Sequence, residues 1–165
     1  MPIVPFETLS DSARIWVFAS DRPVQGAAAD TLLAEVDRFL ADWKAHGVPL
    51  RNARDWRDER FLTIGVDVNE ENASGCSIDG LFRILQELQR EIGVQLIGGG
   101  RVFYRTHNGI ETTTRDQFAE RAKRGEIPRD CVVFDPSLTD LGTWRAKFEQ
   151  PAARAWTARY FPAED

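Results

Sequence analysis

The alternation of apolar and polar positions predicts three strands and a helix in the first part of the chain. Runs rich in β-branched and aromatic residues, ARIWVFA at 13–19 and FLTIGVDV at 61–68, are typical of strands. Between them, apolar residues at helical spacing predict a helix over about 28–46, which a glycine and a proline then end. The arginine-rich stretch 50–56 predicts a weaker strand that forms a hairpin with 61–68.

A second helix and a further strand complete an alternating order. Ser77 is a suitable N-cap for a helix whose apolar stripe runs to Gly93, and RVFYR at 101–105 is typical of a strand. The order is then strand, helix, strand, strand, helix, strand, as in an antiparallel sheet with both helices on one face. The sequence therefore predicts an α+β fold with a ferredoxin-like βαββαβ core; a differently connected α+β sandwich is the alternative.

The remaining residues predict shorter elements. Thr114 and Gln117 form a capping box for a short helix, CVVF at 131–134 is typical of a buried strand, and two more helices follow towards the C-terminus. The order predicts a C-terminal helical extension of the core.

Length and composition favour one compact domain. The chain has 165 residues, of which 42% are hydrophobic and 28% charged, as in ordinary globular proteins. We expect a single domain over 1–165, with the core and its hairpin in 1–112 and the extension 113–165 packed on the core.

The net charge and the cysteine content indicate which compartment the protein occupies and which classes of partner it binds. The net charge of −5 makes a nucleic acid an unlikely partner. Two cysteines in unlike contexts, Cys76 and Cys131, predict free thiols in a reducing compartment. No apolar run approaches the roughly 20 residues of a membrane helix, and the N-terminal residues do not resemble a signal peptide. We therefore expect a cytoplasmic protein without a membrane partner.

The turn before the second predicted helix is the main candidate site. Ser74, Gly75, Cys76 and Ser77 precede that helix, and Asp79 lies in its first turn. A helix start favours negative charge, so this segment suits either a small anionic ligand or a Cys76 thiolate. The structural alternative is a turn in which Ser77 caps the helix and Cys76 packs as a small hydrophobic residue.

Other chemistry has less support in the sequence. A thiol enzyme needs a base, and the only histidines are His46 and His107. The acidic residues near Cys76 match no metal-ligand spacing, and the run Gly98–Gly100 precedes a strand instead of opening a phosphate-binding helix. We therefore expect no metal and no cofactor.

One face of the predicted sheet carries aromatic residues that the two helices do not cover. We expect this face to be buried by the C-terminal extension, with self-association of the chain as the second hypothesis and nucleic acid as a distant third. The residues assigned to it are Arg14, Trp16, Phe18, Phe61, Thr63 and Asp67, together with Trp56 and Phe103.

Several segments carry a resemblance to a known family. PFETLSDSARIWVFASDR, FLTIGVDV, ASGCSIDG and the region from Trp144 to Trp156 resemble a small family of bacterial proteins without an established function, nearly end to end. Some members carry the label "ABC transporter ATPase", although this chain has no GxxxxGK[ST] P-loop. The resemblance implies a bacterial cytosolic protein, supports attention to residues 73–79 and implies no catalytic residues.

Three hypotheses follow. The first is a binding module that holds a small anionic ligand or a protein partner at Gly75, Cys76 and Ser77. The second is a thiol-dependent enzyme or redox sensor with Cys76 as its reactive thiolate. The third is a homodimer joined through the aromatic sheet face.

Overall fold

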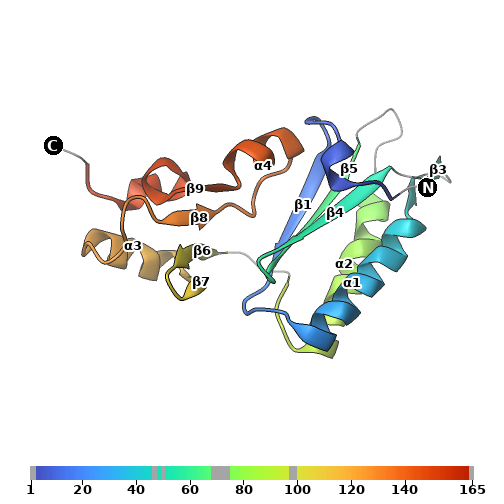
Figure 1. Cartoon of the computed structure of the whole chain (residues 1–165), viewed down its shortest axis with the longest axis horizontal. Coiled ribbons are helices and arrows are strands. Elements are labelled where there is room, and N and C mark those ends of the chain that lie inside the picture. Colours follow the sequence, from blue (N-terminus) through green and yellow to red (C-terminus); the bar gives the residue numbers. More distant parts are fainter. Residues whose placement is uncertain (1–2, 46–47, 50, 68–74, 97–99, 164–165) are drawn as a thin grey trace. The chain divides into compact units, whose positions relative to one another are not determined.

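The computed structural model divides the chain into two compact units (Figure 1). Unit 1 comprises Met1–Gly98 and Ser137–Gly142, and unit 2 comprises Gly99–Pro136 and Thr143–Asp165. The structure describes residues 3–45, 48–49, 51–67, 75–96 and 100–163. A single domain over 1–165, with the extension packed on the core, stays a prediction.

Unit 1 is built on a three-stranded antiparallel sheet in the order β1-β5-β4. Its elements are β1 (Arg14–Ala19), α1 (Gly26–Ala41), β2 (Lys44–Ala45), β3 (Val48–Pro49), β4 (Asn52–Arg57), β5 (Phe61–Val66) and α2 (Gly75–Ile92), after a short 3-10 helix at Phe6–Thr8. The predicted hairpin of β4 with β5 is confirmed, and β2 pairs with β3 as a separate short hairpin.

Both long helices of unit 1 lie side by side along one face of this sheet (Figure 1). Their apolar residues recur at three- and four-residue spacing, so each helix presents one stripe to the strands. The resulting core contains Leu32, Val36 and Leu40 from α1, Leu81, Leu85 and Leu88 from α2, and Phe18, Leu62, Ile64 and Val66 from the strands.

Strand register corrects the predicted aromatic face. Trp16, Phe18 and Trp56 belong to the cluster on the helix side of the sheet. Trp16 stands opposite Ile64, and both Phe18 and Trp56 stand opposite Leu62. Residues opposite each other in a sheet point to the same face, so these aromatics share the face of Leu62 and Ile64. Assigning them to the uncovered face was therefore wrong.

The N-terminal segment packs against the other face. An added Cβ at Gly65 would lie 2.7 Å from Leu9 Cδ1 and 3.6 Å from Phe6 Cε2. Phe6 and Leu9 are both buried. A strand glycine without a side chain therefore lets this segment approach the sheet closely.

Unit 2 contains a four-stranded antiparallel sheet in the order β7-β6-β8-β9. Its strands and longer helix are β6 (Arg101–Thr106), β7 (Gly109–Thr114), α3 (Arg115–Lys123), β8 (Val132–Phe134) and β9 (Glu149–Pro151). Two 3-10 helices follow at Ala152–Arg154 and Trp156–Tyr160. The helix α4 (Leu141–Lys147) begins in unit 1 and continues into unit 2. The Thr114 half of the predicted capping box is confirmed, because the Thr114 hydroxyl accepts the Gln117 N–H at 3.2 Å. The Gln117 side chain accepts from the Thr113 hydroxyl instead of completing the box.

The α+β class is confirmed, whereas the ferredoxin-like strand order is not. The strand expected to complete the first sheet, β6, pairs with β7 and β8 in the second sheet. Beside β1 lies the segment that returns to unit 1: Ile15 N–H donates to the Thr139 carbonyl at 2.9 Å, and Leu141 N–H donates to the Ala13 carbonyl at 2.9 Å. An edge strand must satisfy its exposed backbone groups, and this segment does so although its sequence shows no strand pattern.

Candidate functional site

The predicted site at the start of α2 falls largely outside the described residues. The helix begins at Gly75, so Cys76 and Ser77 lie in its first turn and the predicted start at Ser77 is two residues late. Ser74 lies outside the described residues, as do the side chains of Cys76 and Ser77. Asp79 is exposed on the same helix. A ligand or a reactive thiolate at this helix start stays a prediction.

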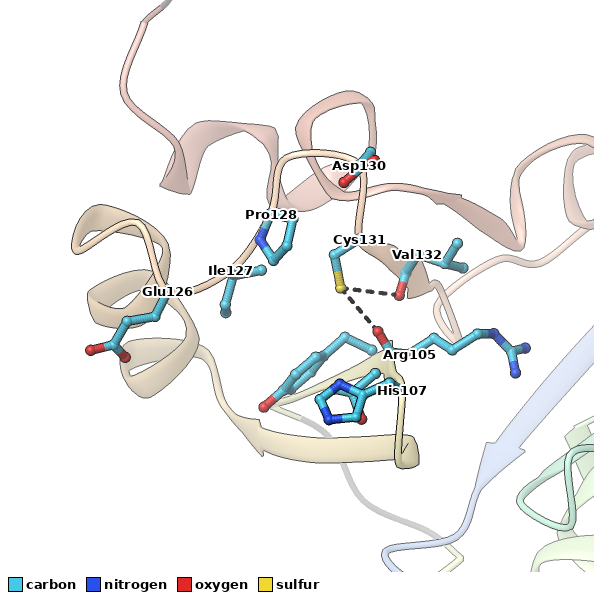
Figure 2. A pocket seen from close by; sticks show the side chains of 10 residues that line it. Arg105, His107, Glu126, Ile127, Pro128, Asp130, Cys131 and Val132 are labelled. Carbon is cyan, nitrogen blue, oxygen red and sulfur yellow. Dashed lines mark hydrogen bonds between the residues drawn. The ribbon is translucent and has the colours of Figure 1, made fainter.

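Unit 2 carries a cavity of about 560 Å³. This volume lies within the roughly 300–1,000 Å³ typical of sites for small organic ligands. Figure 2 shows the cavity from close by; its lining residues are Tyr104, Arg105, Thr106, His107, Glu126, Ile127, Pro128, Asp130, Cys131 and Val132.

Two segments far apart in the sequence form the walls. One is the end of β6 with the following turn, and Figure 2 shows His107 on that side. The other is the 126–132 segment, whose residues Ile127, Pro128 and Cys131 lie across from it. β6 and β8 pair antiparallel, which holds the two segments together.

The end of α3 positions the 126–132 segment. Gly125 adopts a φ of +77°, a left-handed conformation that glycine accepts without strain. Its N–H donates to the Ala122 carbonyl at 3.1 Å, and the Glu126 N–H donates to the Arg121 carbonyl at 2.9 Å. This pair of bonds is a Schellman motif, which ends the helix and turns the chain so that Ile127 is buried.

Cys131 is the central polar group of this wall. Its thiol donates to the Arg105 carbonyl, with Sγ and the oxygen 3.3 Å apart, and Sγ lies 3.8 Å from the Val132 carbonyl oxygen (Figure 2). Partial burial raises the pKa of the Cys131 thiol, and the nearby Asp130 carboxylate acts in the same direction. The thiol is therefore protonated at neutral pH, which makes it a hydrogen-bonding group and a weak nucleophile.

Tyr104 lines the cavity and contacts two residues of α3. Its hydroxyl accepts a hydrogen bond from Arg121 Nη1 at 2.8 Å, and its ring packs edge-on against Phe118 with centroids 5.5 Å apart. Burial is the main cause that raises the pKa of Tyr104, so the phenol stays neutral over the physiological range. Because Tyr104 is only 4% exposed, its ring is mainly part of the core of unit 2 and offers a ligand little surface.

Charges around the cavity are distributed unevenly. Arg105 pairs with Glu149 at 3.1 Å and lies over the Phe134 ring, and Figure 2 shows its side chain extending away from the cavity. Glu126 and Asp130 lie at the rim, are exposed, and have no ion-pair partner among the residues that the structure describes. The rim therefore has a negative character.

Sequence reasoning missed this cavity. In the sequence, His107 is a candidate base for Cys76 or a surface residue of a hairpin turn, and Cys131 begins a predicted buried strand. The structure places His107 and Cys131 on the same cavity, whereas His46 lies outside the described residues. The one available signal was the Asn108-Gly109 turn, which puts His107 at a hairpin end. Nowhere in the described parts of the chain do three His, Cys, Asp or Glu side chains gather as metal ligands.

Comparison with known proteins assigns no family to the chain. No family model matches it, and neither a curated protein nor a solved structure matches it. Within the described ranges, no helix is long and apolar enough to cross a membrane. The bacterial family named above stays a resemblance.

Proposed function

We propose that the protein is a small-ligand-binding module and that its ligand occupies the cavity of unit 2. The observation that carries this proposal is a hollow of about 560 Å³ whose exposed lining is mostly apolar, with polar side chains around it. Ile127, Pro128 and Val132 supply apolar surface, while Cys131 and His107 supply hydrogen-bonding groups at defined positions. Ligand pockets combine these features, because apolar contact supplies affinity and a few polar groups orient the ligand.

The state of Cys131 favours binding over thiol chemistry at this cavity. A nucleophilic cysteine needs a lowered pKa, from a helix start or from neighbouring positive charge. Here burial and Asp130 raise the pKa, and the thiol proton is engaged by the Arg105 carbonyl. Cys131 therefore acts as a polar contact for the ligand.

The test uses two neutral aromatic probes, indole and benzyl alcohol. Each is titrated into the ¹⁵N-labelled protein while amide chemical shifts are followed. We expect the largest shifts at residues 104–107 and 126–132, with saturation at high probe concentration. Shifts that do not saturate, or that cluster elsewhere in the chain, contradict the proposal.

A matched pair of variants locates the binding. Val132→Trp places a large ring into the cavity, whereas Ile110→Trp adds the same ring to β7 outside the lining. Both parent residues are half-buried and lie in strands of one sheet, β8 inside it and β7 at its edge. We expect Val132→Trp to abolish saturable binding and Ile110→Trp to retain it. Circular dichroism confirms that both variants are folded.

We also propose a cytoplasmic location. Cys131 is a free thiol, as expected in a reducing compartment. Fractionation of the source cells, with the protein detected by antibody, tests this location.

A further inference from the structure

We infer that the cavity of unit 2 selects an organic cation, an amine on an apolar or aromatic body, over neutral and anionic molecules of the same shape. This inference rests on the proposed function, because it names the chemical class of the ligand for the same cavity. It differs from the anionic ligand that the sequence predicts at the start of α2.

The first argument for a cationic ligand rests on the negative charges at the rim of the cavity. Glu126 and Asp130 both lie on the 126–132 segment and line the cavity. Both carboxylates are exposed and have no ion pair among the described residues. Figure 2 shows the Glu126 side chain directed away from His107 and Cys131, so its charge acts on a ligand from the mouth of the cavity and not from inside it. Asp130 directly precedes Cys131 in the chain and lines the same cavity, so its charge lies close to the cavity wall.

The positive charges nearby are engaged elsewhere. Arg105 lines the cavity with its backbone while its guanidinium pairs with Glu149. Arg121 donates to the Tyr104 hydroxyl and does not line the cavity. Arg129 donates to a backbone carbonyl at 2.8 Å and lines a different cavity. No arginine or lysine side chain of the described lining is therefore positioned to attract an anion.

The apolar wall of the cavity indicates the apolar body that the ligand carries beside its amine. Ile127 and Pro128 form an apolar wall that a hydrocarbon or an aromatic ring can cover. An amine on that body would remain near the rim, where Glu126 and Asp130 attract it and water still solvates it. The arrangement combines apolar contact inside with opposite charge outside, which is how amphipathic cations bind with little desolvation cost.

The test compares three probes that share one ring and differ in charge: benzylamine, benzyl alcohol and benzoate. Dissociation constants are measured by amide-shift titration at low and high sodium chloride. We expect benzylamine to bind most tightly and benzoate most weakly. Added salt should weaken benzylamine and leave benzyl alcohol unchanged, because exposed charges are screened over about 10 Å at 0.1 M salt.

Variants that neutralise the rim identify its contribution. Glu126→Gln and Asp130→Asn should each weaken benzylamine by about twofold to fivefold, the range for exposed charge pairs, without changing benzyl alcohol. Glu120→Gln is the control, because Glu120 is exposed on α3 and outside the lining. We expect no change in either probe for this control.

The outcomes separate the two proposals. If benzyl alcohol binds in the cavity as tightly as benzylamine and the rim variants change nothing, the charge selection is overturned while the proposed function stands. If none of the three probes gives saturable shifts at the cavity, the proposed function fails and the charge selection fails with it.

Discussion

Replacing Gly65 by alanine tests how the N-terminal segment packs on the sheet of unit 1. The new Cβ would lie 2.7 Å from Leu9 Cδ1, closer than side-chain carbons approach in proteins. Leu9 is only 2% exposed, so its side chain cannot move aside into solvent. The substitution therefore overfills a packed site.

The magnitude follows from two opposing effects. Overpacking a buried site costs about 1–3 kcal/mol. Alanine in place of a strand glycine returns about 0.5–1 kcal/mol of backbone entropy. We expect Gly65→Ala to lower the free energy of unfolding by roughly 0–2.5 kcal/mol, with the middle of that range as the central expectation.

A double-mutant cycle in urea, followed by circular dichroism, isolates the contact. Leu9→Ala alone should cost about 2–5 kcal/mol, because it removes a buried side chain. In the Leu9→Ala background there is room for the new Cβ, so Gly65→Ala should become neutral or stabilising. The expected coupling is about 1–3 kcal/mol. Strict additivity of the two substitutions would refute the close approach of Leu9 to Gly65.

Two further predictions concern unit 2. Folding raises the Cys131 pKa, so its stabilising contribution is complete below the unfolded value of about 8.5 and is lost as the pH rises through the folded value. In a Cys76→Ser background, iodoacetamide should therefore alkylate Cys131 more slowly at pH 8 in the native protein than in urea, and equal rates would contradict the raised pKa. Thr114→Ala should cost about 1 kcal/mol in urea unfolding, because the Gln117 N–H loses its acceptor, whereas Thr114→Ser should cost less; equal losses would indicate that the cap contributes little.

The sequence predicted most elements of unit 1 because each depends on local periodicity. Apolar residues at helical spacing marked α1 and α2, and the period of two along 61–68 marked β5. The face assigned to Trp16 and Phe18 was wrong because alternation divides a strand into two faces without saying which of them meets the helices. Only the pairing of β1 with β5 settles that question.

The sequence predicted the candidate site less well than it predicted the elements of unit 1. The Gly75–Ser77 segment attracted attention through a local motif, whereas the cavity of unit 2 has no motif at all. His107 and Cys131 line it together although 23 residues separate them in the chain. The two meet because β6 pairs with β8, and a short strand such as CVVF offers the same backbone groups to any neighbour.

The sequence by itself determined the α+β class, the two long helices, the cap at Thr114 and the hairpin of β4 with β5. These features depend on side-chain spacing and on interactions within a few residues. The tertiary structure alone decided that β6 joins the second sheet, that residues 139–141 lie beside β1, and that a cavity with an acidic rim forms near Cys131. Strand pairing depends on backbone hydrogen bonds and on burial between distant segments. A local pattern therefore shows that a segment is a strand but not which strand it pairs with.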